Sequence, residues 1–263
     1  MKKHISNSQL ETYWRCPEQY RRRYIEGEKV APGVALLVGS GVHVGAETNF
    51  KQKIESHRDL SADDIIDAAV AGFDQRVTVD GYTLSSDEQS QGARHAIGAA
   101  RDVVVTLAAL HAAEQAPAYQ PTEVEKVTTI VLDNCSRDLV AITDLRDDKK
   151  RVCDFKTAAR KPSDDKAHKS LQLTIVAAAY QVDHGEPCSD VRLDVLTKKD
   201  PKRYVLQSQR DERDFASLAA RIETTVSAID AGIFPPTSPG NWACSERWCG
   251  FARTCPFYSR RTS

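Results

Sequence analysis

The chain has 263 residues, with 36 lysines and arginines against 37 aspartates and glutamates and a formal net charge of −1. This length suffices for a sizeable hydrophobic core. The balanced charge excludes a protein that is basic over its whole surface, so any DNA-binding surface must be a local patch.

Membrane and export signals are absent from the sequence pattern. The longest apolar runs, near Val34–Val38 and Val103–Leu110, are too short to span a membrane. Polar residues follow the basic start Met1–His4, where a signal peptide needs an apolar segment. We therefore expect a cytoplasmic protein with no membrane partner.

Helices are expected in the first 115 residues. The pattern Ser8–Glu11 is typical of a capping box and predicts a helix that carries Cys16. Glycines surround His43 and indicate a turn that opens another helix. Residues 61–115 are rich in alanine and contain no proline, which predicts a helical segment.

Strands are expected in the middle of the chain. Tyr119–Leu132 predicts one strand, and a β-hairpin follows it. In that hairpin the short apolar strands Ala141–Asp144 and Val152–Thr157 flank the charged turn Asp147–Lys150, so that an acidic residue closes the first strand.

The second hairpin strand carries an acid-x-lysine triplet, Asp154-Phe155-Lys156. Side chains of a strand alternate between its faces, so Asp154 and Lys156 share one face while Phe155 points into the core. In the simplest hairpin register Asp144 approaches the same place. Two carboxylates and one ammonium group on one face are what a magnesium-dependent phosphodiester hydrolase needs. A solvated, charged hairpin is the other interpretation. Glu125, on the preceding strand, either borders this site or belongs to a solvated strand face, which is the preferred interpretation.

The rest of the chain predicts a helix over 166–184, a second hairpin of Val191–Thr197 with Arg203–Gln207, and an amphipathic helix over 211–231. Together the elements predict an α/β fold with a mixed sheet flanked by helices. Two groups of basic residues are candidates for contacts with a DNA backbone, although a solvated loop explains the first group nearly as well. They are Arg160, Lys161, Lys166 and Lys169, and Arg21, Arg22 and Arg23 between Tyr20 and Tyr24.

Four of the seven cysteines lie near the ends of the chain: Cys16, Cys244, Cys249 and Cys255. In a reducing compartment such a set indicates a metal site rather than disulfides. Four thiolates match the ligand count of a 4Fe-4S cluster, and the spacing is looser than in zinc ribbons. Iron–sulfur, zinc and ordinary buried thiols all remain open at this point. A metal site here would join the first helix to the last segment.

These motifs occur in one order along nearly the whole chain. They are Ser6–Leu10 with Tyr13, Cys16, Tyr20 and Tyr24, then Gly41–His43, Asp144, Asp154–Lys156, Gln172 and the three late cysteines. In this combination the chain resembles the RecB-like branch of the PD-(D/E)xK nucleases, specifically the iron–sulfur exonucleases typified by the CRISPR-associated RecB-like exonuclease family. Two positions depart from that family. Asp154 stands where many relatives have glutamate, and Val176 where a tyrosine is usual, so that Tyr180 is expected to take its role.

The resemblance implies a restriction-endonuclease-like fold, with a mixed central sheet flanked by helices, in a single nuclease domain of residues 1–263. It implies a helical insertion at 55–117, expected to arch over the site and admit single strands. An iron–sulfur staple would join the N- and C-terminal segments in a subdomain of 1–30 plus 235–263. The implied residue roles fall into three groups: catalysis by Asp144, Asp154, Lys156 and Gln172; a 4Fe-4S cluster on Cys16, Cys244, Cys249 and Cys255; and Mg²⁺ or Mn²⁺ on His43, Asp144, Asp154 and the Phe155 carbonyl.

The expected activity is that of a metal-dependent DNA exonuclease acting on single-stranded or end-bearing DNA. Recombination, repair and CRISPR adaptation are the expected settings, with the proteins of those pathways as partners and a homo-oligomer as an open possibility. The alternative is a non-catalytic DNA-binding accessory protein of a recombination complex, held together by an iron–sulfur cluster or by zinc. That alternative predicts an incomplete set of two acids and a lysine, whereas this sequence keeps the set complete.

Overall fold

The computed structural model describes residues 3–238, 240–246 and 248–258. The chain forms a mixed α/β fold and divides into two compact units. Unit 1 comprises Met1–Ala31, Thr129–Val140 and Ala216–Ser263, and unit 2 comprises Pro32–Thr128 and Ala141–Phe215. The single nuclease domain, the helical insertion and the iron–sulfur subdomain stay predictions. Of that subdomain, residues 1–2, 239, 247 and 259–263 lie outside the described part of the chain.

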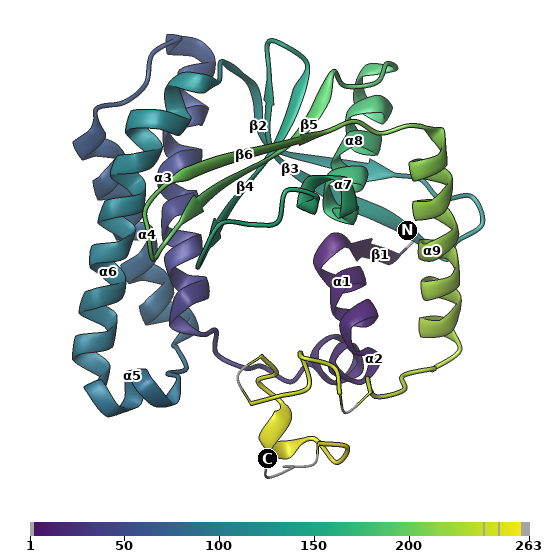
Figure 1. The fold of residues 1–263 in the computed structure, drawn as a ribbon. Helices are drawn as coiled ribbons and strands as arrows, with labels where there is room; N and C mark the ends of the chain where they lie inside the picture. The colour runs from purple at the N-terminus through teal and green to yellow at the C-terminus, as the bar shows by residue number, and fades with distance from the viewer. Residues whose placement is uncertain (1–2, 239, 247, 259–263) are drawn as a thin grey trace. The chain divides into compact units, whose positions relative to one another are not determined.

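The strands form one mixed sheet (Figure 1). Strand β3 (Arg137–Asp147) continues from unit 1 into unit 2, where it pairs antiparallel with β4 (Arg151–Ala158). Strand β4 pairs parallel with β5 (Asp190–Thr197), which pairs antiparallel with β6 (Arg203–Ser208). Strand β2 (Pro121–Ile130) pairs with β3. Both predicted hairpins are therefore confirmed.

The first hairpin differs from the sequence expectation at its turn. Strand β3 runs on to Asp147, so Asp144 lies inside the strand and does not close it. Asp147 is only 4% exposed and accepts hydrogen bonds from the backbone and guanidinium of Arg151. The Asp147 carboxylate can therefore be buried, because its charge-assisted pair with Arg151 replaces the hydrogen bonds to water that burial removes.

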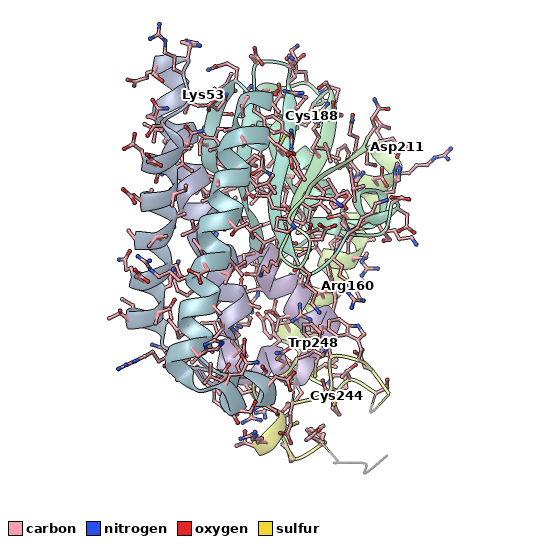
Figure 2. All side chains as sticks on the ribbon, turned by 60° about the vertical axis from the view of Figure 1, so that its left-hand side comes forward. Lys53, Arg160, Cys188, Asp211, Cys244 and Trp248 are labelled. Carbon is pink, nitrogen blue, oxygen red and sulfur yellow. The ribbon has the colours of Figure 1, made fainter. Side chains whose placement is uncertain are left out.

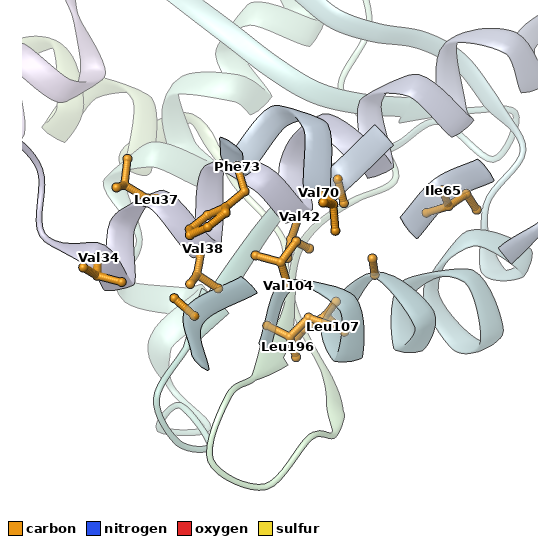
Figure 3. Packing of buried hydrophobic residues seen from close by; sticks show 13 residues of the cluster. Val34, Leu37, Val38, Val42, Ile65, Val70, Phe73, Val104, Leu107 and Leu196 are labelled. Atoms are coloured by element: carbon orange, nitrogen blue, oxygen red, sulfur yellow. The ribbon is translucent and has the colours of Figure 1, made fainter. Parts of the chain in front are cut away.

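Helices α3 (Val34–Ser56), α4 (Ala62–Asp80) and α6 (Ala93–Leu110) pack together in unit 2, with the short α5 (Ser86–Gln91) beside α6. Their apolar faces form one cluster (Figure 3), which includes Val38, Val42, Phe73, Val104 and Leu107 together with Leu196 of β5. The chain continues through single turns at His111–Gln115 and Ala116–Ala118. The helical prediction for 61–115 is confirmed, with an interruption between α4 and α5.

The prediction of a glycine-rich turn around His43 is wrong. Helix α3 runs through His43 without interruption, and its glycines serve packing between helices. A Cβ on Gly41 would lie 2.8 Å from the Phe73 Cβ, and one on Gly45 would lie 2.8 Å from the Ala69 Cβ. Only residues without a side chain allow α4 to approach α3 this closely.

The segment predicted as one helix over 166–184 is broken at Ser170 into α7 (Lys166–Lys169) and α8 (Leu171–His184). The Ser170 hydroxyl accepts a hydrogen bond from the Leu173 backbone and caps α8. An apolar cluster joins α8 to the strands of unit 2, and it includes Val152, Leu173, Val176, Tyr180, Val191 and Leu193.

A buried cation holds β3 to its neighbours in unit 2. Arg146 is 1% exposed, and its guanidinium contacts the carboxylates of Glu123 at 2.9 Å and Asp183 at 2.6 Å. It also donates to the Thr128 hydroxyl at 3.2 Å. Removing this side chain would deprive two half-buried carboxylates of the cation that they share.

Unit 1 begins with β1 (Lys3–Ser6), which pairs parallel with the first residues of β3. Helix α1 (Asn7–Arg15) starts at a capping box made by Ser6 and Gln9, two residues earlier than predicted. The chain continues through α2 (Pro17–Tyr20) and a single turn at Arg21–Ile25. Helix α9 (Glu212–Asp230), predicted over 211–231, belongs to unit 1 from Ala216 onward.

Among the described residues, one helical segment, Ala93–Ala118, is long and apolar enough to cross a membrane by length and composition alone. In the structure its residues Val104 and Leu107 are fully buried in the cluster with α3 and α4. The apolar face of this segment packs on α3 and α4, as the apolar face of an amphipathic helix in a folded core does.

Candidate metal and catalytic site

The first hairpin brings Asp144 and Asp154 together. Leu145 pairs with Cys153, so the same register places Asp144 opposite Asp154, with both side chains on one face. The carboxylate of Asp144 also accepts a hydrogen bond of 2.8 Å from the Phe155 backbone amide. The two acids singled out in the sequence therefore meet at one place on the sheet.

Asp154 is the point where the other predicted residues converge. It is 3% exposed, and its Oδ1 atom accepts from the Lys156 ammonium at 2.8 Å and from the Gln172 amide at 2.5 Å. Lys156 shares the face of Asp154 because the two are separated by one residue in a strand. Gln172 reaches it from the first turn of α8. The structure thus brings together all four residues for which catalysis was predicted.

Phe155 points to the other face, as the alternation of strand side chains predicts. Its ring stacks on Phe50 with centroids 5.4 Å apart and meets Tyr119 edge to face at 5.8 Å. This packing fixes the strand segment that carries the triplet. The role of the Phe155 carbonyl as a metal ligand stays a prediction.

The pKa of Asp144 reflects its burial beside Asp154. Burial and the negative charge of Asp154 raise the pKa of Asp144 to about 7, although His43, Lys156 and the Phe155 amide act in the opposite direction. A carboxyl group at such a place ionises more easily when another cation arrives. The pair of acids is therefore suited to bind a divalent ion, for which carboxylate oxygens are ordinary ligands.

His43 makes a contact that the sequence did not predict. Its Nε2 atom lies 2.7 Å from Oε1 of Glu125, on β2. Burial alone would lower the pKa of His43, but the hydrogen bond to Glu125 and the charges of Asp144 and Glu125 raise the pKa to about 9. The preferred interpretation of Glu125 as part of a solvated strand face is therefore wrong, and this residue borders the site.

Glu47 completes a compact group with these two residues. Ligand atoms of His43, Glu47 and Glu125 all lie within 4.8 Å of one another, and all three residues are half-buried. Glu47 follows His43 by four residues, which places it one turn further along the same helix face. That spacing was a signal in the sequence, whereas Glu125 is too far along the chain for any spacing rule to find it.

A small hollow adjoins the site in unit 2. It is lined by Gly39, Val42, His43, Ala46, Gln115, Phe155, Lys156, Thr157 and Leu196. His43 and Lys156 are the basic groups in this lining, and the Lys156 side chain is 45% exposed. A ligand in the hollow therefore meets mostly apolar walls, with His43 and Lys156 as basic groups and Gln115 and Thr157 as further polar ones.

The four terminal cysteines line a hollow of their own in unit 1, where Figure 2 labels Cys244. All four are free and partly buried. Burial and the charges of Cys16 and Cys255 raise the pKa of Cys244, and burial with the other three thiols raises the pKa of Cys249. The donor set fits a thiolate-bound metal or cluster, because four sulfurs line one space. Among the described residues, these sulfurs do not form a group as compact as that of His43.

The basic group near Tyr20 is largely engaged within unit 1. Arg22 is 7% exposed and pairs with Glu28 at 2.7 Å, and Tyr20 is 1% exposed. The prediction that this segment contacts DNA is wrong for these two residues, because neither side chain reaches the surface.

The basic group after β4 is more accessible. Arg160 is exposed on the loop that follows the strand (Figure 2). Lys161 pairs with Asp164, and Lys169 pairs with Asp165. Contact of this group with a DNA backbone stays a prediction.

Tyr180 was expected to replace the missing family tyrosine. Its ring instead stacks on His184 with centroids 4.3 Å apart and lies 5.5 Å from the Arg146 guanidinium. These contacts pack Tyr180 against Arg146 of β3. They do not bear on its expected role in substrate positioning, which stays a prediction.

Comparison with known proteins decides the family. The sequence matches the PD-(D/E)XK nuclease superfamily over residues 4–256. The chain belongs to this superfamily. Its members are nucleases, so the four converging residues are the candidates for their chemistry. The narrower resemblance to the RecB-like iron–sulfur exonucleases remains a prediction.

One solved structure gives the fold further support. It is a crystal structure at 2.19 Å of a protein from Eubacterium rectale that carries a provisional exonuclease name; it has a TM-score of 0.55 and 12% identity, over 99% of this chain and 91% of the other. At this identity the likeness shows the fold alone. A second structure, SSO0001, has a TM-score of 0.39 and 17% identity over 88% of this chain and 89% of the other, and carries no argument. No curated protein matches the chain.

Proposed function

We propose that this nuclease is a metal-dependent DNA exonuclease whose active centre is Asp144, Asp154, Lys156 and Gln172. The observation that carries the proposal is the carboxylate of Asp154, which is buried and receives both Lys156 and Gln172 while Asp144 stands opposite. Burying one acid beside a second acid costs stability, and a purely structural role does not explain that cost. Metal-dependent phosphodiester hydrolysis can use such a pair of acids to hold its ion, with a cation to stabilise the charge on the phosphate.

In this proposal the two aspartates bind the metal. Asp144, Asp154 and the Phe155 carbonyl would hold Mg²⁺ or Mn²⁺, and His43 would add a nitrogen ligand to the same ion, which would favour Mn²⁺. When bound, the ion polarises the scissile phosphate and lowers the pKa of a water molecule.

The other two residues act on charge and position. The Lys156 ammonium stabilises the negative charge that develops on the phosphate during hydrolysis. Gln172 holds the Asp154 carboxylate in place through its amide, from the rigid first turn of α8.

We also propose that Cys16, Cys244, Cys249 and Cys255 bind a 4Fe-4S cluster. The support is that four free thiols from the two ends of the chain line one hollow. A cluster there would hold α2 to the segment after α9 within unit 1, as a structural rather than a catalytic group. Zinc is the other metal that this donor set accepts, and visible absorption at about 400 nm separates the two.

The proposed substrate is single-stranded DNA or the end of a duplex, in recombination, repair or CRISPR adaptation in the cytoplasm. The support for a strand end is the resemblance to exonucleases together with the small hollow beside Lys156. The helical segment 55–117 would restrict entry to single strands. Proteins of those pathways are the proposed partners, and a second copy of the chain is another.

The test compares the wild type with Asp154→Ala on linear and circular DNA, each with Mg²⁺ and with Mn²⁺. We expect the wild type to degrade linear DNA only and the variant to lose at least about 10³-fold in rate. Val127→Ala is a matched control, because Val127 is exposed on β2 and makes no part of the site. Equal cleavage by the wild type and Asp154→Ala would remove the proposed centre. Equal cleavage of circular DNA would make the protein an endonuclease.

A further inference from the structure

Two loops of unit 2 concentrate positive charge beside the ends of β4 and β5. They are the loop 158–164, which follows β4, and the turn 198–202, which joins β5 to β6. A backbone hydrogen bond of 2.8 Å from Lys198 to Ala158 connects the two. Together they contain five cationic side chains and two carboxylates, in a chain whose formal net charge is −1. This is the kind of local patch that an anionic strand needs.

The carboxylates neutralise only part of this charge. Each of the two pairs with a lysine of its own loop. Among the described residues, the cations of these loops that form no ion pair are Arg160, Lys198 and Lys199, and we call them the loop patch. Arg160 and Lys199 are exposed, whereas Lys198 is half-buried. The sequence had drawn attention to Arg160 but not to the two lysines.

Lys198 is held at a place that disfavours its charge. Its ammonium group donates to the carbonyl of Ala35 at 2.6 Å, in the first turn of α3. The dipole of a helix disfavours a cation at its N-terminus. Burial lowers the pKa of Lys198 to about 8. The folded protein therefore gains little stability from this ammonium group, and an anion beside it would offset the cost of removing it from water.

One face of α3 leads from Lys198 to the proposed catalytic centre. Ala35, Gly39 and His43 follow one another at intervals of four residues, so they lie on the same side of the helix. Lys198 contacts Ala35, while Gly39 and His43 line the hollow beside Lys156. Eight residues of helix span about 12 Å. A DNA strand carries one charge per about 3.4 Å of helix axis, so a strand with one phosphate at the centre can bring another to Lys198.

The simplest alternative is that these cations only keep the loops solvated. It accounts for Arg160 and Lys199, because both are exposed. It does not account for Lys198, since a lysine of a solvated loop keeps its ammonium group in water. A second alternative is that Lys198 ties the β5–β6 turn to α3 through Ala35, as a structural contact. The two alternatives and a role in binding predict different results for the same substitutions.

We propose that Arg160, Lys198 and Lys199 bind a phosphate group of the DNA strand outside the catalytic centre. The identity of the strand as a substrate rests on the proposed function above, but the affinity of the loop patch for a phosphate does not. The phosphate belongs to an internal phosphodiester or to a strand end, since both present anionic oxygens to the same cations. Such a contact carries no sequence preference and fixes the position of the strand relative to Lys156.

The experiment measures the binding of labelled single-stranded DNA to the intact protein by fluorescence anisotropy. Salt is varied between about 50 and about 200 mM, and divalent ions are left out so that the strand stays intact. The variants are Lys198→Gln and a triple variant that also carries Arg160→Gln and Lys199→Gln. Lys149→Gln is the matched control, because Lys149 is an exposed lysine on the turn before β4. Melting temperatures without DNA are recorded for each.

We expect the slope of log affinity against log salt to fall by about 0.7 in Lys198→Gln and by about 2 in the triple variant. At the lowest salt, Lys198→Gln should bind about five- to tenfold more weakly than the wild type. Lys149→Gln should match the wild type. The melting temperature of Lys198→Gln should stay the same or rise, because a cation is removed from the first turn of α3.

Three results would overturn the proposal. One is a triple variant with the salt slope of the wild type. Another is an equal change of slope in Lys149→Gln, which would show an effect of net charge alone. The third is a lower melting temperature of Lys198→Gln with unchanged binding, which would make Lys198 a structural contact between the β5–β6 turn and α3.

The form of the DNA identifies the source of the phosphate. The same titrations are made with circular single strands and with linear strands that carry a hydroxyl group or a phosphate at either end. If circular and linear strands lose the same affinity in Lys198→Gln, the loop patch binds an internal phosphodiester. If only strands with a phosphorylated end lose affinity, it binds a terminal phosphate. Both results support the site.

Cleavage assays separate this proposal from the proposed function. If the triple variant loses affinity while Asp154→Ala cleaves DNA like the wild type, the loop patch stands and the catalytic centre falls. If Asp154→Ala is inactive while the triple variant binds DNA like the wild type, the catalytic centre stands and the loop patch falls.

Discussion

Replacing Asp144 by asparagine should stabilise the metal-free protein at neutral and alkaline pH. The substitution keeps the size of the side chain and an oxygen that can accept from the Phe155 amide. It removes a carboxyl group whose pKa is raised from 3.8 to about 7 by burial and by Asp154. The folded state therefore holds this proton over a pH range in which the unfolded chain has already released it.

The sign follows from proton linkage. Between pH 3.8 and about 7 the folded state binds more protons than the unfolded state, so stability falls as the pH rises through this window. Between about pH 5 and about pH 8 the loss from this one group amounts to about 2–3 kcal/mol. His43 acts in the same direction, because its pKa is raised to about 9 and its stabilising contribution is lost as the pH rises towards that value. Some pH dependence should therefore remain in the variant.

The assay is urea denaturation of the wild type and Asp144→Asn at about pH 5 and about pH 8, in buffer without divalent ions. We expect the wild type to lose about 2–3 kcal/mol more than the variant between the two pH values. Added Mn²⁺ should stabilise the wild type at the higher pH and have a smaller effect on the variant, which should also be inactive. Parallel pH dependence in the two proteins would refute the reasoning that burial beside Asp154 disfavours the charged form of Asp144.

The remaining predictions concern other parts of the molecule. Lys156→Ala should lower kcat by about 10²–10³-fold with little change in KM, measured by steady-state cleavage of linear DNA. Cys249→Ser should lose bound iron and absorption at about 400 nm, whereas Cys188→Ser, also a partly buried thiol, should keep both in metal analysis. Arg146→Ala should cost about 3 kcal/mol of stability in urea denaturation, because it removes the cation that two half-buried carboxylates share. Gly41→Ala should cost about 1–3 kcal/mol in the same assay, since its Cβ would lie 2.8 Å from a side-chain carbon of α4.

The parts of the fold that the sequence predicted are those with a local signal. The hairpin of β3 and β4 has apolar strands on both sides of a charged turn, and residues 61–115 have a helical pattern without proline. The glycines near His43 misled the interpretation, because a glycine that permits a turn and a glycine that permits close helix packing look alike in one sequence. Only the neighbouring helix, with Phe73 at the contact, distinguishes the two.

The basic residues near Tyr20 show that the exposure of a charged side chain is equally hard to predict from local sequence. A run of arginines between tyrosines predicts an exposed nucleic-acid contact, yet Arg22 is buried because Glu28 pairs with it and Thr254 accepts from it at 2.7 Å. The threonine, near the end of unit 1, lies 232 residues away in the sequence. No local pattern contains that information.

The error about His43 has a consequence for the site itself. In a turn, His43 would have no fixed relation to Glu47, but in a continuous helix the two lie one turn apart on one face. Gly41 and Gly45 make this helix possible in a crowded place, because they let α4 pack against it without displacing it. The backbone of Glu125 on β2 takes a left-handed conformation, with φ of 52°, and its carboxylate still reaches His43. A non-glycine residue adopts that conformation only where its surroundings compensate the strain. The helix glycines and the strained strand residue thus both help to hold His43 against Glu125, a contact that no local sequence pattern contains.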